Sequence, residues 1–413
     1  MADSQKNRIF YGWWIVTAVF LNLFFAVGII FYGFPVFYPE FVMSLQFTRA
    51  QVTQGFFVGL MVAGLPCGLL AGDLIDRIGG RWVILTGVGL IGTALLLMGS
   101  MTRFWHYELL CVLEVLGYVL AGPIANQVLI ACWFRTRRGR AMGYAYLGLG
   151  LGGVVAPPLI TFLIHRFGWR NALETVGLLV MAVLFPVGIW ITRSDPADLG
   201  LFPDGASKPG EVSEMATDIT TKIGADIYTA NFWLILAGST LVVGAIGAVI
   251  QHFILFLRDQ GYTATVAARC MTVLLFSSLI GRVVVGYVAD RHSKKNTMAL
   301  FYLLIGIAVL LLGTSHEGIA IWIFSIVFGF SMGADYMLVP LVVAECFGTR
   351  SLGKLLALII MGYSLGQWGA PWVVGRIYDA RHGYDLAWKI MGTTGLMGAA
   401  AIYAVATSLR RER

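Results

Sequence analysis

The amino-acid sequence predicts an all-α membrane protein with twelve transmembrane helices in two pseudo-symmetric six-helix bundles. Of its 413 residues, 58% are hydrophobic and 12% are charged, and the mean hydropathy is +0.80, far from the proportions of soluble proteins. The chain also contains a repeat. Gly72-Asp73-Leu74-Ile75-Asp76-Arg77 returns 214 positions later as Gly286-Tyr287-Val288-Ala289-Asp290-Arg291. The same spacing relates Gly148, Gly152, Ala156 and Pro157 to Gly362, Gly366, Ala370 and Pro371. Two parallel repeats in such a chain indicate two related halves.

Twelve apolar runs are long enough to cross a hydrocarbon core of ~30 Å at ~1.5 Å per residue. We predict spans at 11–35, 52–72, 82–101, 105–131, 141–165, 170–192, 231–257, 265–289, 297–314, 318–344, 353–375 and 384–406. Gly and Pro inside these runs are tolerated in a membrane, because neighbouring helices satisfy the freed backbone groups.

The distribution of Lys and Arg predicts the orientation. With both termini in the cytoplasm, the inner segments hold 19 basic residues and the outer segments nine, as the positive-inside rule requires. The net charge of +7 is thereby explained by topology, so we expect no nucleic-acid partner.

Three further features complete the organisation. The N-terminus lacks the pattern of a cleaved signal peptide, so the first span should remain in the mature protein. The five cysteines have no metal-ligand spacing, so we expect no metal and no cofactor. Residues 193–230 are polar and rich in Gly and Pro, which predicts a cytoplasmic linker between an N-terminal bundle, 1–192, and a C-terminal bundle, 231–413.

Several glycine-rich strings imitate enzyme motifs. The strings at 148–153 and 87–92 fit a dinucleotide-binding pattern, and those at 329–333 and 362–366 fit a hydrolase nucleophile elbow. All four lie within predicted spans and lack the strand-to-helix context that such chemistry needs. We interpret them as close helix packing and do not expect an enzyme.

The repeated Gly-x-x-x-Asp-Arg element ends the second and eighth predicted spans. Its charged side chains can pair with neighbouring helices or cap a helix terminus. We expect a conformational latch there, and the alternative is a plain loop that sets topology. The latch residues are Asp73, Asp76, Arg77, Asp290 and Arg291.

These motifs resemble those of the major facilitator superfamily, whose characteristic loop motif is this repeated element. More narrowly, the chain resembles the monocarboxylate transporter family, including its bacterial branch. The string from Trp133 to Gly143 follows that family's aromatic-Phe-x-x-Arg-Arg-x-x-Ala-x-Gly signature, and Arg282 matches its substrate-binding arginine. Two positions depart from the family: the first span has no lysine around Tyr32 to Phe34, and Ser278 stands where an aspartate is usual. The resemblance therefore implies anion binding more directly than it implies the family's proton route.

Arg282 is the first candidate for substrate binding. It lies eight residues before Asp290, about 12 Å from the helix end. A guanidinium at that depth costs at least ~3 kcal/mol unless it is paired or hydrated. Its planar fork suits a carboxylate, so a carboxylate substrate is a natural counter-ion, and a permanent structural ion pair is the alternative.

Two other buried groups could carry a proton. Asp335 in the tenth span lies at a depth similar to that of Arg282, so it could neutralise Arg282 and take a proton when substrate arrives; a static bond to Arg282 or to a tyrosine is the alternative. His252 in the seventh span could bind substrate or titrate near neutral pH, or it could be a packing residue.

The remaining polar candidates are weaker, because each could equally form an interhelical hydrogen bond. For substrate binding we select Asn126, Tyr118, Tyr336 and Tyr363. Asn22, Gln127, Tyr144 and Gln367 could also line a cavity, and Glu114 could belong to a gate.

Taken together, the residues and the resemblance predict a secondary active transporter. We expect proton-coupled symport of a small monocarboxylate such as lactate or pyruvate, by alternating access at a mid-membrane site between 1–192 and 231–413. One alternative is an organic anion exchanger of the oxalate/formate antiporter type, although a dianion would favour two buried basic residues. Another is a non-transporting membrane sensor or receptor. We expect a monomer in a cell inner membrane, with the carboxylate, the proton and lipid as its partners.

Overall fold

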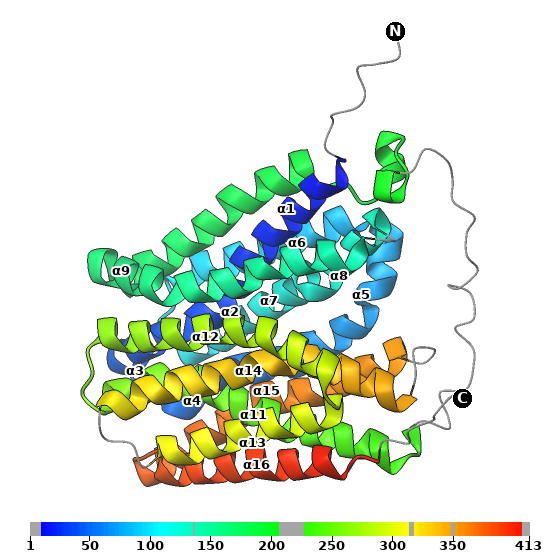
Figure 1. The fold of residues 1–413 in the computed structure, drawn as a ribbon. Helices are drawn as coiled ribbons and strands as arrows, with labels where there is room; N and C mark the ends of the chain where they lie inside the picture. The colour runs from blue at the N-terminus through cyan, green and yellow to red at the C-terminus, as the bar shows by residue number, and fades with distance from the viewer. Residues whose placement is uncertain (1–9, 135–136, 206–226, 314–317, 348–351, 407–413) are drawn as a thin grey trace. The chain divides into compact units, whose positions relative to one another are not determined.

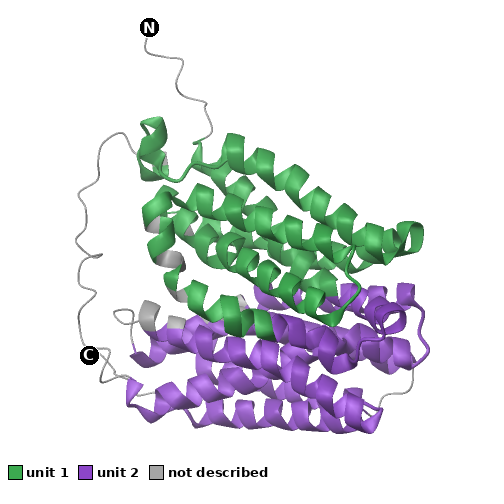
Figure 2. Cartoon of the chain, turned by 180° about the vertical axis from the view of Figure 1, so that it is seen from behind, with its two compact units in different colours: residues 1–34, 58–218 green, residues 35–57, 219–413 purple. Residues whose placement is uncertain are grey.

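The computed structural model describes residues 10–134, 137–205, 227–313, 318–347 and 352–406. Helices make up almost all of these residues (Figure 1). The chain divides into two compact units (Figure 2). Unit 1 comprises Met1–Phe34 and Val58–Asp218, and unit 2 comprises Pro35–Phe57 and Ile219–Arg413. The short segment 35–57 therefore belongs with the C-terminal half of the sequence.

Unit 1 contains the helices of the first half, several of them interrupted. Its helices are α1 (Gly12–Asn22), α2 (Ile30–Gly33), α5 (Leu65–Ile78), α6 (Gly80–Met98), α7 (Phe104–Ala121), α8 (Pro123–Trp133) and α9 (Arg138–Pro186). A π-helical turn, Leu23–Ile29, joins α1 to α2. The single predicted span 105–131 is broken between α7 and α8, because Gly122 is extended and Pro123 begins the next helix. Two predicted spans form the two arms of α9, joined at Gly168, where φ is 76°.

Unit 2 begins with a helical hairpin and continues with six long helices. Its helices are α3 (Tyr38–Leu45), α4 (Arg49–Gly59), α11 (Ala230–Asp259), α12 (Ala264–Arg291), α13 (Lys294–Leu312), α14 (Gly318–Phe347), α15 (Leu352–Arg381) and α16 (Asp385–Ala404). The first predicted span ends at residue 35, but the helical path continues through a 3-10 turn, Phe34–Phe37, into α3. Pro35 and Pro39 explain this change of helix type, because neither residue has a backbone N–H to donate.

The described helices agree with the twelve predicted spans. Nine helical stretches in the described residues are long and apolar enough to cross a membrane. The stretch Gly139–Ile191 contains two predicted spans, and α15 and α16 coincide with the last two.

The sequence repeat corresponds to the same glycine contact in each unit. In unit 1, a Cβ added at Gly152 of α9 would lie 2.3 Å from the Phe24 carbonyl oxygen in the turn after α1. In unit 2, a Cβ added at Gly366 of α15 would lie 2.3 Å from the Thr240 carbonyl oxygen of α11. Both distances are too short for any side chain. The repeated glycines therefore let two helices approach closely, as small residues do in membrane bundles.

Candidate functional site

Arg282 lies on α12, where a close contact with α14 fixes its backbone. A Cβ added at Gly333 of α14 would lie 2.2 Å from the Ser278 carbonyl oxygen and 3.0 Å from the Arg282 nitrogen. The residue is half-buried within a predicted membrane span. The glycine contact leaves little freedom for the Arg282 Cα, so the long side chain extends from a fixed point. Such an anchored guanidinium can bind an anion in a defined geometry.

Asp335 belongs to a polar cluster of unit 2, which we call the Asp335 cluster: Ser239, Tyr302, Asp335 and Tyr363. The Tyr302 hydroxyl of α13 donates a hydrogen bond of 2.5 Å to Asp335 Oδ1 on α14. The same hydroxyl lies 3.5 Å from Ser239 Oγ on α11, and Tyr363 of α15 lies nearby. Asp335 is 6% exposed. The sequence offered Arg282 or a tyrosine as the partner of Asp335, and the hydrogen bond is to a tyrosine.

His252 is fully buried, with a partner at each ring nitrogen. Nε2 lies 2.8 Å from the Pro371 carbonyl oxygen, and Nδ1 lies 3.1 Å from the Tyr384 hydroxyl. Because a carbonyl oxygen only accepts, we assign the proton to Nε2 and let Tyr384 donate to Nδ1. This geometry satisfies a neutral imidazole, as expected of a packing histidine. Its role in binding or proton transfer stays a prediction.

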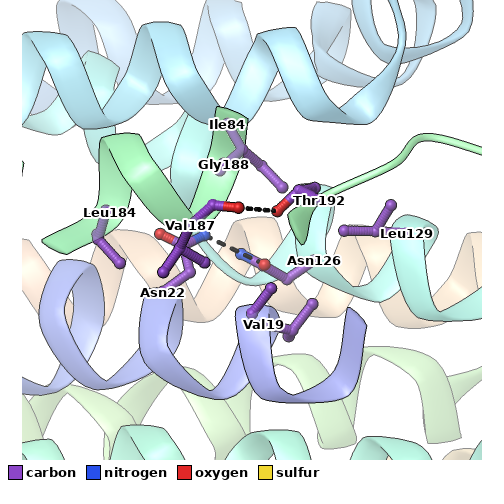
Figure 3. A pocket seen from close by; sticks show the side chains of 10 residues that line it. Val19, Asn22, Ile84, Asn126, Leu129, Leu184, Val187, Gly188 and Thr192 are labelled. Atoms are coloured by element: carbon purple, nitrogen blue, oxygen red, sulfur yellow. Dashed lines mark hydrogen bonds between the residues drawn. The ribbon is translucent and has the colours of Figure 1, made fainter. Parts of the chain in front are cut away.

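Asn126 closes the break between α7 and α8 in unit 1. Its Nδ2 donates to the carbonyl oxygens of Ala121 (2.7 Å) and Gly122 (2.8 Å) at the break, and the Gly122 oxygen also accepts from the Asn126 backbone nitrogen (3.4 Å). Asn22 of α1 donates to Ala121 O (2.8 Å) and to Asn126 Oδ1 (3.1 Å). Figure 3 shows the two asparagines pointing toward each other. They fasten the broken helix to α1.

A small cavity lies beside these asparagines (Figure 3). It is lined by Ala18, Val19, Asn22, Ile84, Asn126, Leu129, Leu184, Val187, Gly188 and Thr192. The space open to the centre of a water-sized sphere is only about 10 Å³, room for about one water molecule. A three-carbon acid does not fit here. The position of Asn126 therefore indicates a structural contribution in this conformation.

Tyr118 of α7 belongs to a second polar cluster, which lies in unit 1. Tyr32 and Tyr146 lie near Tyr118. Gln127 of α8 donates a hydrogen bond to the Tyr146 hydroxyl of α9. Tyr118 is among the predicted binding residues, whereas Tyr146 is not; Tyr144, a predicted cavity residue, lies elsewhere on α9. Tyr144 is 57% exposed and its ring lies 5.9 Å from that of Trp13.

The other predicted residues are only partly described. Asp73, Arg77 and Arg291 are exposed near the ends of α5 and α12. The side chains of Asp76, Asp290 and Tyr336 lie outside the described residues. The latch at these helix ends stays a prediction.

Sequence reasoning missed Tyr302 and Ser239, and it missed Arg49. Tyr302 and Ser239 are polar residues inside predicted spans, and this position could have marked them as candidates for a buried polar cluster. Arg49 lies between the first two predicted spans, in an outer segment. It is 8% exposed and forms an ion pair of 2.6 Å with Asp259.

The comparison with family models decides the broad class. The model of the Major Facilitator Superfamily matches residues 20–367 and 232–413. The chain belongs to the major facilitator superfamily. It is therefore a multi-pass membrane protein and a secondary transporter, and it is not an enzyme. Superfamily membership also accounts for the two related halves and the repeated loop motif.

Individual relatives in the superfamily are distant. Monocarboxylate transporter 13 of Rattus norvegicus is 25% identical over 401 residues, covering 95% of this chain and 88% of the relative. Monocarboxylate transporter 12 of Homo sapiens is 24% identical, covering 92% and 78%. The MFS transporter asaE of Aspergillus flavus is 24% identical, covering 81% and 72%. The similarity extends to monocarboxylate transporters and to fungal transporters of other names.

Solved structures confirm the fold. A bacterial homologue of the human lysosomal transporter Spinster, crystallised inward-facing and unoccupied, has a TM-score of 0.74 and 16% identity, covering 97% of this chain and 98% of the homologue. A point mutant of the nucleoside transporter NupG has a TM-score of 0.75 and 13% identity, covering 95% and 99%. At these identities the likeness concerns the fold alone.

Proposed function

We propose that this transporter carries a small monocarboxylate of the lactate or pyruvate type together with a proton. The observation that supports the proposal is Arg282, a guanidinium within a membrane span whose backbone is fixed against Gly333. A charged side chain at that depth is expensive to insert and is usually functional. The distant similarity to two monocarboxylate transporters agrees with this choice.

A monocarboxylate suits the chemistry of Arg282. The two oxygens of a carboxylate match the guanidinium fork and can accept two charge-assisted hydrogen bonds. Binding one anion to the one guanidinium neutralises the site, whereas a dianion would leave one charge uncompensated. The single charge of Arg282 therefore favours a monocarboxylate over an oxalate-type substrate.

Asp335 is our proposed proton carrier. Its carboxyl group is buried between helices and accepts a hydrogen bond from Tyr302. A buried carboxylate is held in a medium where charge is unfavourable, so its protonation can respond to a nearby anion. Arg282 binds the anion and Asp335 takes the proton, so that the loaded transporter gains no net charge. His252 is the alternative carrier.

The decisive test is uptake of labelled lactate into proteoliposomes that contain the full-length protein. Symport predicts accumulation when the outside is acidic and little accumulation without a pH gradient. Exchange predicts uptake only when the vesicles contain a counter-anion, whatever the pH gradient. A sensor predicts binding without flux. Either of the last two results would overturn the proposal.

A further inference from the structure

Two arginines of unit 1 donate to the same backbone oxygen. Arg81, near the start of α6, donates from Nη2 to the Ile189 carbonyl oxygen at 2.6 Å, and Arg193 donates from Nη1 to that oxygen at 3.2 Å. Ile189 lies in the π-helical turn Val187–Ile191, which follows α9. Two guanidinium groups that share one acceptor lie close together, and their like charges repel each other. The pair therefore concentrates positive charge at one place on unit 1.

The surrounding backbone holds the two arginines in place. A Cβ added at Gly188 would lie 2.4 Å from Leu85 Cδ2 of α6, so the π-helical turn packs closely on that helix. The Arg81 backbone nitrogen donates to the Ser194 hydroxyl oxygen at 3.2 Å, which connects the first turn of α6 to the residue after Arg193. Each guanidinium thus extends from a backbone position that is fixed by a neighbour.

The described carboxylates do not compensate this charge. Neither Arg81 nor Arg193 forms an ion pair with a carboxylate of the described residues. The two acids that follow Arg193 are used in a short 3-10 turn: Asp195 Oδ1 accepts from the Ala197 nitrogen (2.8 Å), and Asp198 Oδ2 accepts from the Asp195 nitrogen (3.3 Å). Within the described residues, the Arg81 guanidinium donates one hydrogen bond, although its planar fork can donate several. Both arginines therefore keep donors for an anion.

Helix capping is the structural alternative. Arginine side chains often donate to the last carbonyl oxygens of a helix, and Arg193 also donates to the Thr192 oxygen at 3.0 Å. One guanidinium is enough to cap the Ile189 oxygen, however, and a second one adds repulsion between like charges. Capping alone therefore does not explain why two arginines meet here.

Exposed tryptophans flank the arginine pair. Trp82 follows Arg81 and is 56% exposed, and Trp190 follows Ile189 and is 72% exposed. The Arg81 guanidinium lies 5.2 Å from the centre of the Trp82 ring. Tryptophan side chains are enriched at the boundary between lipid and water. On the predicted topology this boundary is the cytoplasmic one, because the pair directly precedes the predicted linker 193–230, and cytoplasmic leaflets carry anionic lipids.

We propose that Arg81 and Arg193 bind the phosphate of an anionic phospholipid in the cytoplasmic leaflet, with Trp82 and Trp190 against the upper part of its acyl chains. The oxygens of a phosphate accept paired hydrogen bonds from guanidinium groups. Two positive charges favour a lipid with net negative charge, since a zwitterionic headgroup would bring its own ammonium to them. The acyl chains distinguish the lipid from free phosphate, because only a lipid uses the tryptophans. The site is independent of which substrate is transported.

Native mass spectrometry of the delipidated full-length protein tests the site. The protein is titrated with phosphatidylglycerol, phosphatidylcholine or inorganic phosphate, and the affinity of the first bound molecule is measured. We expect Arg81→Gln and Arg193→Gln each to weaken binding of phosphatidylglycerol about tenfold or more, as the loss of a hydrogen bond to a charged group predicts. Glutamine keeps an amide donor for the Ile189 oxygen. Trp190→Ala, which changes an exposed side chain, should also weaken binding.

Two matched controls should keep the wild-type affinity. Arg137→Gln removes an equal charge from the exposed start of α9, on the same predicted side, and Trp105→Ala removes a tryptophan that is 57% exposed at the start of α7. Wild-type affinity for phosphatidylglycerol in both Arg81→Gln and Arg193→Gln would overturn the proposal, as would an equal loss in Arg137→Gln. Equal affinity for phosphatidylcholine would refute recognition of the anionic headgroup. Displacement of phosphatidylglycerol by inorganic phosphate would assign the pair to a soluble anion instead.

Discussion

Replacing Gly366 by alanine tests the contact that the sequence repeat encodes. The added Cβ would lie 2.3 Å from the Thr240 carbonyl oxygen, whereas ordinary contacts begin near 3.4 Å. Helices α11 and α15 must separate, and overpacking of this kind costs about 1–3 kcal/mol. Alanine recovers ~1 kcal/mol of helix propensity, so the net loss should be as much as about 2 kcal/mol.

The matched substitutions make the prediction specific to the contact. Gly152→Ala should be about as harmful, because its Cβ meets the Phe24 carbonyl oxygen at the same distance. Gly143→Ala on α9 should be neutral or stabilising, since nothing lies within 4 Å of its Cβ. Thermal unfolding of the purified proteins, followed by tryptophan fluorescence in one detergent, measures the three effects. Equal unfolding temperatures for Gly366→Ala and Gly143→Ala would refute the reasoning.

Three further predictions concern the candidate sites. Arg282→Lys should raise the KM for lactate about tenfold or more, because an ammonium cannot form the paired hydrogen bonds of a guanidinium. The control Arg269→Lys, at the exposed start of α12, should leave the KM unchanged. An unaltered KM in Arg282→Lys would contradict bidentate binding. If His252 carries the proton, His252→Gln should abolish the rise of uptake on external acidification, and a wild-type pH profile would assign the residue to packing. Asn126→Ala removes two hydrogen bonds to the carbonyl oxygens at the α7–α8 break. It should lower the free energy of unfolding by about 1–3 kcal/mol, measurable as a lower unfolding temperature. Wild-type stability would show that the break needs no support from Asn126.

The sequence correctly predicted the spans and the packing role of the repeated glycines. A span is a local property, because hydrocarbon demands about twenty apolar residues in succession wherever they lie in the fold. The repeat at 214 positions also needs no coordinates, and Gly152 and Gly366 confirm it as the same helix contact. The Gly122-Pro123 pair is a sequence signal for the break between α7 and α8, but the predicted span 105–131 runs through it.

The partners of the polar groups could not be predicted in the same way. Asp335 bonds to Tyr302 because α13 and α14 are neighbours and their rotations bring the two side chains together, and hydropathy reports neither fact. The hydrogen-bond partners of His252 could not be predicted either, because they are 119 and 132 positions away in the sequence.

The sequence by itself determined that this chain is a two-fold repeated, twelve-span membrane protein with a basic residue inside one span. The tertiary structure alone decided that the hairpin 35–57 packs with the C-terminal half and that Arg49 is buried against Asp259. The physical reason is the range of the interactions. The apolar length of a span and the 214-residue repeat can be read along the chain, whereas an ion pair, or a helix cap provided by another helix, exists only after distant helices have met.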